Sequence, residues 1–132
     1  MKKYLSLVLL GLVVIFSSCS KEKVSEQFTL LTDHVWTSDS LLANGVDASG
    51  QGQVLEFFKG DAIFNEDGTG TFGQYSGNWL FADNETSLAI TSPDLPFALS
   101  THIEELTALS LKVSFVYPGV TTVSIRMTFK PK

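Results

Sequence analysis

The side chains that could support nucleophilic, acid–base or metal chemistry are few in this chain, and their spacing suits none of these reactions. His34 and His102 stand far apart, and neither belongs to a His-x-x-x-His pair. A metal site would need unrelated loops to converge, whereas zinc ligands usually occur in closely spaced pairs. Cys19 is the only cysteine, which excludes an intrachain disulfide and a cluster of thiolates. We therefore expect neither a metal nor a cofactor.

The segment around Asp67-Gly68 has part of the pattern of a calcium-binding loop. When Gly68 is aligned with the glycine of such a loop, Ile63 falls at the first ligand position and Gln74 at the last, where a carboxylate is required. Asn65, Asp67 and Gly68 are instead typical of a turn between two strands, with the glycine supplying a positive φ. The sequence therefore predicts a turn here.

Two other segments fall short of a catalytic pattern. Residues 73–77 do not have the Gly-x-Ser-x-Gly spacing of a nucleophile elbow, so Ser76 is expected in a turn. Glu104 and Glu105 are adjacent, so on a strand they would point to opposite faces and could not act together as acid and base. With no suitable constellation of side chains, we predict that the protein is not an enzyme.

The charge of the chain is acidic, and its distribution limits the partners. Two of the nine basic residues precede Cys19 and all fourteen acidic residues follow it, so the part after the cysteine has seven basic residues and a net charge of −7. Binding to nucleic acid or to anionic lipid headgroups needs clustered lysine and arginine against phosphate. We therefore expect no nucleic-acid partner, and any membrane attachment needs another cause.

The first residues have the order of a secretory signal. Met1-Lys2-Lys3 precedes an apolar run from Tyr4 to Phe16, which matches a charged region followed by a hydrophobic region. A membrane-spanning helix needs about 20 apolar residues, and this run ends well before that length. We therefore predict that the segment 1–18 is cleaved off.

The residues Phe16-Ser17-Ser18-Cys19 resemble the lipobox of bacterial lipoproteins. The resemblance implies that Cys19 carries three acyl chains, palmitate among them, and becomes the new N-terminus. It also implies a lipid anchor in the cell envelope, which we expect at the outer membrane, on its periplasmic or its surface face. The mostly polar segment Ser20 to Gln27 would form a flexible tether. The expected division is 1–18 signal peptide, 19–28 lipidated cysteine and tether, and 29–132 folded domain.

The folded part consists of short β-prone stretches separated by turn residues. The last two, Leu109–Val116 and Val123–Lys130, alternate apolar and polar residues on either side of Tyr117-Pro118-Gly119, which predicts a hairpin with one buried face. His102–Leu106 is compatible with a short strand or one helical turn. The other expected strands are Val35–Leu42, Gln53–Phe58, Asp61–Phe64, Thr69–Tyr75, Asn78–Ala82 and Ser87–Thr91.

About eight antiparallel strands in roughly 105 residues predict an all-β domain, either a closed barrel or, as the alternative, a β-sandwich. Closure removes exposed strand edges, which favours the barrel. Three segments, Trp36 to Ser40, Asp67 to Phe72 and Gly77 to Trp79, together with the alternating C-terminal strands, resemble the lipocalin-like domain lipoproteins of Bacteroidetes.

The lipocalin resemblance implies a barrel whose first strand carries a tryptophan covered by an arginine of the last strand. Trp36 and Arg126 occupy these relative places, although His34 stands where lipocalins have glycine. The inward residues would line a ligand cavity or form a solid core: Phe72, Trp79, Leu111, Val113, Phe115, Ile125, Met127 and Phe129.

Two functions are compatible with these patterns. The first is a lipid-anchored lipocalin-like lipoprotein of the envelope that binds a small apolar ligand. The second is an envelope lipoprotein with a structural or protein-interaction role and no ligand. The two hypotheses differ in whether the barrel interior is hollow.

Overall fold

The computed structural model describes residues 24–117 and 121–132. The signal segment and Cys19 lie outside the described residues, as do Pro118 and Gly119 of the last predicted turn. The elements are α2 (Glu26–Thr32), β1 (Val35–Ala43), β2 (Val46–Asp47), the 3₁₀ turn η1 (Glu56–Phe58), β3 (Asp61–Phe64), β4 (Thr69–Phe72), β5 (Tyr75–Ala82), β6 (Ser87–Thr91), β7 (Leu99–Leu106), β8 (Leu111–Tyr117) and β9 (Val123–Pro131).

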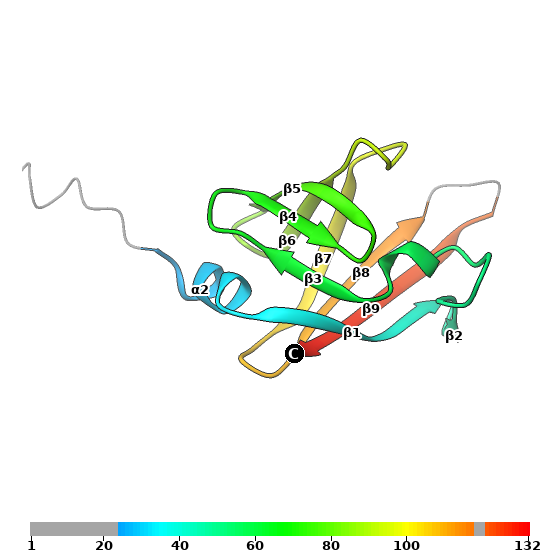
Figure 1. The fold of residues 1–132 in the computed structure, drawn as a ribbon, viewed down its shortest axis with the longest axis horizontal. Coiled ribbons are helices and arrows are strands. Elements are labelled where there is room, and N and C mark those ends of the chain that lie inside the picture. Colours follow the sequence, from blue (N-terminus) through cyan, green and yellow to red (C-terminus); the bar gives the residue numbers. More distant parts are fainter. Residues whose placement is uncertain (1–23, 118–120) are drawn as a thin grey trace, which may run out of the picture.

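The strands form a closed antiparallel barrel, which confirms the predicted fold class (Figure 1). Neighbouring strands pair in the order β1-β3-β4-β5-β6-β7-β8-β9, and β9 pairs back onto β1 to close the ring of eight. The short strand β2 pairs with the end of β1 and is the one extra strand. The sandwich alternative is therefore wrong, because a single sheet closes on itself.

The alternation in the sequence determines which side chains enter the barrel. In β8, Leu111, Val113 and Phe115 are buried, and the residues between them face outward. The same pattern runs through β9, where Ile125 and Met127 are buried. Successive side chains of a strand point to opposite faces, so one apolar set per strand is sufficient to fill the interior.

One predicted strand, Gln53–Phe58, is wrong. This segment contains η1, in which the Phe58 N–H donates to the Leu55 carbonyl at 3.1 Å. Leu55 and Phe58 are both buried and lie three residues apart, a spacing that matches one turn of 3₁₀ helix. The segment thus packs against the barrel instead of extending it. His102–Leu106 proves to be part of β7.

The helix α2 crosses the expected boundary between tether and domain at residue 28. The Ser25 hydroxyl caps it by accepting from the Phe28 N–H at 3.1 Å, and Leu31 on its inner side is fully buried. Seven residues are too few for a stable isolated helix, so packing against the barrel holds it. The same shortness explains why periodicity in the sequence did not indicate it.

The barrel has two ends of different character. Because consecutive strands run in opposite directions, α2 shares one end with the turns at 65–68, 83–86 and 107–110, and we call this the near end (Figure 1). The far end carries β2, η1, the β4–β5 turn and the long β6–β7 connection at 92–98. The described chain therefore enters the barrel at its near end.

Candidate functional site

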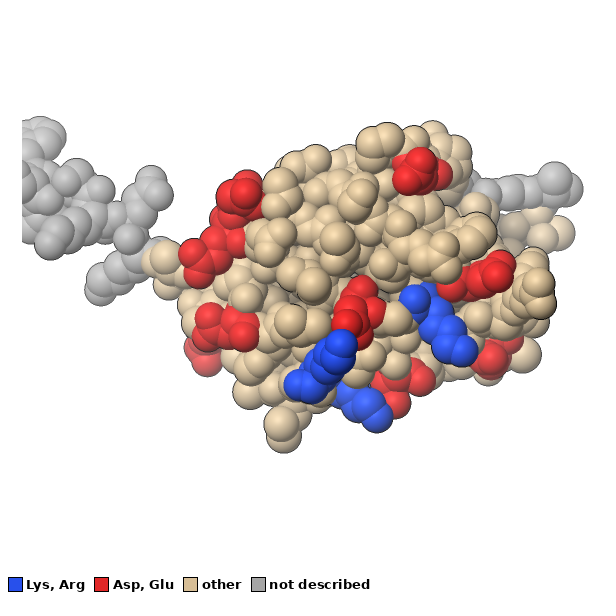
Figure 2. Space-filling model, viewed as in Figure 1, with Lys and Arg blue, Asp and Glu red and all other residues tan. Residues whose placement is uncertain are grey.

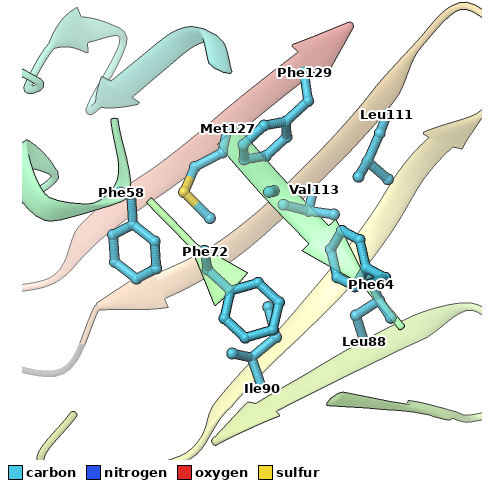
Figure 3. A pocket seen from close by; sticks show the side chains of 10 residues that line it. Phe58, Phe64, Phe72, Leu88, Ile90, Leu111, Val113, Met127 and Phe129 are labelled. Carbon is cyan, nitrogen blue, oxygen red and sulfur yellow. The ribbon is translucent and has the colours of Figure 1, made fainter. Parts of the chain in front are cut away.

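The interior of the barrel is filled. All eight residues predicted to point inward are buried, which agrees with the core interpretation of the alternation. The space left between them is a cavity of about 20 Å³, enough for roughly one water molecule. Its lining, most of it labelled in Figure 3, is entirely apolar: Phe58, Ala62, Phe64, Phe72, Leu88, Ile90, Leu111, Val113, Met127 and Phe129.

Five of the predicted lining residues border this cavity, whereas Trp79, Phe115 and Ile125 are buried elsewhere in the core. The remaining five lining residues come from η1, β3 and β6. Alternation in Asp61–Phe64 and Ser87–Thr91 could have indicated those from β3 and β6, because each strand has one apolar set. Phe58 could not be assigned in this way, since it does not belong to a strand.

Aromatic side chains contribute to the filling together with aliphatic ones. The Phe64 ring lies 5.3 Å from the Phe72 ring and 5.7 Å from the Trp79 ring, both between centroids. The Trp79 indole N–H donates to the Asn65 carbonyl at 3.0 Å, so its polar atom is satisfied in a buried position. Tilted and edge-to-face rings at these separations pack favourably, which leaves a small barrel with little free volume.

The predicted contact between Trp36 and Arg126 is not formed. Trp36 is fully buried at the near end and lies opposite Pro131, while Arg126 lies opposite Leu42. The alternation of β9 directs Arg126 to the outer face, where its Nε donates to Glu104 at 2.9 Å. Register and side-chain direction both separate the two residues.

Trp36 seals the near end in another way. Its indole N–H donates to the carbonyl of Leu31, the last buried residue of α2, at 3.0 Å. The His34 ring meets the Trp36 ring edge-on with centroids 5.4 Å apart. The helix α2, which was not predicted, therefore takes the covering position that the resemblance assigned to an arginine.

Strand alternation predicted that Glu104 and Glu105 would point to opposite faces, and this prediction is wrong. A β-bulge between Ile103 and Glu105 interrupts the pairing of β7 with β8, and both carboxylates reach the outer face. Glu104 pairs with Arg126, and Glu105 pairs with Lys112 at 3.4 Å. Hydrogen bonds from Ser110 and then Lys112 lower the pKa of Glu105. Exposed pairs of this kind contribute little to stability, because solvent screens them, and they have a structural role at most.

The segment 65–68 forms a turn, as predicted. The Gly68 N–H donates to the Asn65 carbonyl at 3.1 Å, and Gly68 adopts φ +89°. The Asp67 carboxylate accepts from the Thr69 hydroxyl at 2.6 Å and from the Thr69 N–H at 3.0 Å. Within ranges 24–117 and 121–132, no three histidine, cysteine, aspartate or glutamate side chains gather as a metal site would require.

A pH titration tests the role of Thr69 in this turn. Its hydroxyl and N–H lower the pKa of Asp67 below the ordinary value of 3.8, so the fold favours the ionised carboxylate. The resulting stabilisation is complete above that value and is lost as the pH falls through the folded-state pKa. Thr69→Val, which removes the hydroxyl, is expected to raise the Asp67 pKa in an NMR titration, and Thr69→Ser to preserve it. An unchanged pKa in Thr69→Val would contradict this assignment.

Half-buried and exposed aromatic rings gather at the far end. The Tyr75 ring lies 4.8 Å from the Phe58 ring and 6.2 Å from the Phe57 ring, and Phe57 is 47% exposed. A second pair, Phe97 and Tyr117, has centroids 5.6 Å apart. The rings come from η1, β5, β8 and the 92–98 connection, so the far end presents an aromatic surface that η1 and several strands hold.

The backbone holds η1 against the β4–β5 turn. The Gln74 N–H donates to the Phe57 carbonyl at 2.8 Å, and Gly73 takes φ +64°. A Cβ atom on Gly73 would lie 2.3 Å from the Phe57 oxygen, so only glycine permits this approach. The contact fixes Phe57 beside Tyr75 and leaves a surface recess of about 240 Å³ lined by Phe57, Gln74, Tyr75 and Asp94.

The far-end recess was not predicted from the sequence. Its four residues come from three segments that are distant in the chain, and none of them belongs to a motif of fixed spacing. The only signal was the presence of aromatic residues next to turn residues. That signal is common in β proteins and does not by itself indicate a site.

The described part of the chain is strongly acidic, with thirteen acidic and five basic residues. Acidic side chains are spread around the outline in Figure 2, including both ends, while the basic side chains visible there gather in the lower half. Four of the five described basic residues, all except Lys59, form ion pairs with carboxylates of the barrel wall. The excess negative charge is therefore distributed over the rest of the surface.

No protein-family model matches this chain, and no curated protein sequence matches it. Among the described residues, no helix is both long enough and apolar enough to cross a bilayer.

Proposed function

We propose that this protein is a lipid-anchored lipoprotein of the cell envelope, in the manner of the lipocalin-like domain lipoproteins, whose filled barrel contacts another envelope protein through its far end. The observation that carries the proposal is the interior cavity of about 20 Å³. Pockets for small molecules usually measure about 300–1,000 Å³. A filled barrel has only its outer surface to offer to a partner.

The proposed anchor orients the molecule. Only residues 20–25 separate Cys19 from the start of α2, and an extended chain of this length reaches at most about 25 Å. With acyl chains on Cys19, the near end stays close to the membrane. The far end then points away from the surface, where it is accessible to other proteins.

The far end has the composition expected of an interface. Exposed and half-buried aromatic rings supply large contact areas at low entropic cost, and such residues dominate the binding energy of many protein interfaces. Phe57 and Val54, which are 47% and 41% exposed, stand beside the Tyr75 ring and η1 respectively. Four of the eight large apolar side chains exposed among the described residues lie at the far end, namely Val46, Val54, Phe57 and Val116. Because apolar side chains on a surface cost solubility, this group supports an interaction role.

Binding of a small apolar ligand inside the barrel is the other candidate. It would require the aromatic and aliphatic lining to move apart, since the present cavity has room for about one water molecule. Protein purified without its lipid is expected to release no apolar molecule on denaturation and to bind no apolar fluorescent probe at one equivalent. Stoichiometric release or binding would instead favour the ligand-binding hypothesis.

Site-specific photo-cross-linking in intact cells tests the interaction role. A photoreactive amino acid at Val54 on the far end is expected to form a discrete protein adduct. The same amino acid at Thr71, exposed on the wall, or at Asn84, exposed at the near end, serves as the matched control. Phe57→Ala should reduce the Val54 adduct. Equal labelling from all three positions, or none from Val54, would contradict the proposal.

A further inference from the structure

The far-end recess combines two aromatic rings with a carboxylate that has no counter-ion among the described residues. We propose that this recess binds the cationic side chain of an arginine or lysine of the partner protein. The inference deepens the proposed function and rests on it for the existence of the partner. The binding chemistry itself follows from the residues of the recess.

The aromatic rings provide the first attraction. Phe57 and Tyr75 meet at an interplanar angle of 85° with centroids 6.2 Å apart, so the two rings form two walls of a corner. A cation within about 6 Å of an aromatic face is attracted by the ring quadrupole. Phe57 is 47% exposed, which leaves its surface accessible to an incoming side chain.

The carboxylate provides the second attraction. Asp94 lies in a turn in which the Leu95 N–H donates to the Ser92 carbonyl at 3.1 Å and the Asp94 N–H donates to the Ser92 hydroxyl at 3.3 Å. In contrast to the paired carboxylates on the barrel wall, no lysine or arginine within 24–117 and 121–132 forms an ion pair with Asp94. A bound guanidinium or ammonium group would supply the missing charge.

The pKa of Tyr75 is affected by the carboxylate that shares its recess. Burial raises the pKa of the Tyr75 phenol, and the nearby Tyr117 and Asp94 raise it further. The field of Asp94 thus acts on the Tyr75 phenol, which lines the same recess. A cation placed between them is expected to oppose this field and to lower the Tyr75 pKa.

The charge of the surrounding loops agrees with a cationic occupant. The described loops of the far end carry three carboxylates and one lysine, which gives a net charge of −2: Asp47, Glu56, Asp94 and Lys59. An anionic ligand would be repelled by this surface. A bare metal ion is disfavoured as well, because hard cations need about six or more oxygen ligands, several of them charged, and the side chains of the recess offer one carboxylate, one amide and one phenol.

The size and position of the recess favour a side chain over a free small molecule. Its volume of about 240 Å³ is below the usual range for small-molecule pockets of about 300–1,000 Å³, and it opens to solvent instead of enclosing its occupant. In the proposed orientation it points away from the anchoring membrane. An arginine or lysine side chain on a partner surface could occupy this open recess while its backbone stays on the partner.

An NMR titration of the mature full-length protein, kept in a non-ionic detergent, tests the inference. The probes are N-acetyl-arginine amide and its uncharged isostere N-acetyl-citrulline amide. The arginine derivative is expected to bind with a millimolar Kd, to shift the Gln74 and Tyr75 signals and to lower the Tyr75 pKa. The citrulline derivative should bind at least about fivefold more weakly. Equal binding of the two would overturn the proposal.

Variants identify the residues involved. Asp94→Asn is expected to weaken binding of the arginine derivative about fivefold, and Phe57→Ala about threefold. Asp39→Asn is the matched control, because Asp39 lies in a recess of the barrel wall and is already paired with Lys130 at 3.5 Å. It should leave binding unchanged. An unchanged affinity in Asp94→Asn, or an equal loss in Asp39→Asn, would also overturn the proposal.

The same variants separate this inference from the proposed function. If a Val54 adduct forms in cells but is unaffected by Asp94→Asn, and the arginine derivative does not bind, the far end contacts a partner without a cation in the recess. If the arginine derivative binds as expected and no Val54 adduct forms, the recess has the inferred chemistry and the proposed interaction role is wrong. Loss of the adduct together with loss of arginine binding in Asp94→Asn supports both.

Discussion

Replacing Trp36 with alanine is expected to lower the free energy of unfolding by about 3–5 kcal/mol, the range for removing a large aromatic side chain from a core. Trp36 is fully buried, contacts the His34 ring and donates to the Leu31 carbonyl at 3.0 Å. Its loss would leave a cavity at the near end and release the contact that holds α2. Denaturant unfolding followed by circular dichroism measures the change.

Two further variants assign this effect to its cause. Trp36→Phe retains most of the ring but removes the donor, so we expect a smaller loss of about 1–3 kcal/mol from the unpaired Leu31 carbonyl and the reduced packing. Arg126→Ala is expected to change stability by no more than about 1 kcal/mol, since Arg126 is exposed and forms a surface ion pair with Glu104. If Arg126→Ala were as destabilising as Trp36→Ala, the lipocalin-type contact between the two residues would have to be reconsidered.

Replacing Cys19 with serine is expected to abolish membrane association. A single acyl chain binds a bilayer only marginally, and stable attachment needs more than one, so the proposed anchor depends entirely on the modified cysteine. No surface of the described residues offers a substitute, because their charge is predominantly acidic. Fractionation of cells into soluble and membrane material, together with metabolic labelling by a palmitate analogue, measures the effect.

Ser20→Ala is the control for the anchor, because it alters the neighbouring residue and keeps the thiol. It should remain labelled and in the membrane fraction. Cys19→Ser should also fail to be cleaved before residue 19, which mass spectrometry of the intact protein detects. Wild-type protein that retains Met1, or carries an unmodified Cys19 sulfur, would contradict the lipoprotein assignment.

Much of the barrel was predictable because its strands have one buried face. The alternation in Leu109–Val116 and Val123–Lys130 indicated β8 and β9 to within about two residues and placed Val113, Phe115 and Met127 inside. The turn residues 65–68 likewise indicated the β3–β4 hairpin. These signals are local, because each depends only on the period of a strand or on the φ that one turn requires.

The features that were mispredicted depend on contacts between distant segments. The buried positions of η1 are consistent with a short strand or a helical turn, and packing against the barrel selects the turn. The bulge at Ile103–Glu105 changes the direction of Glu104 without any signal in composition. The covering of Trp36 by α2 requires a helix too short to be recognised by its periodicity.

The sequence by itself determined the class of the domain, its inward residues and the expectation of an anchor at Cys19, because these depend on local patterns. Only the tertiary structure decided that the interior holds a cavity of about 20 Å³, since free volume depends on how side chains from all strands interlock. It alone also brought Phe57, Tyr75 and Asp94 to one recess. Residues distant in the chain become neighbours only when the barrel closes and its loops gather at one end.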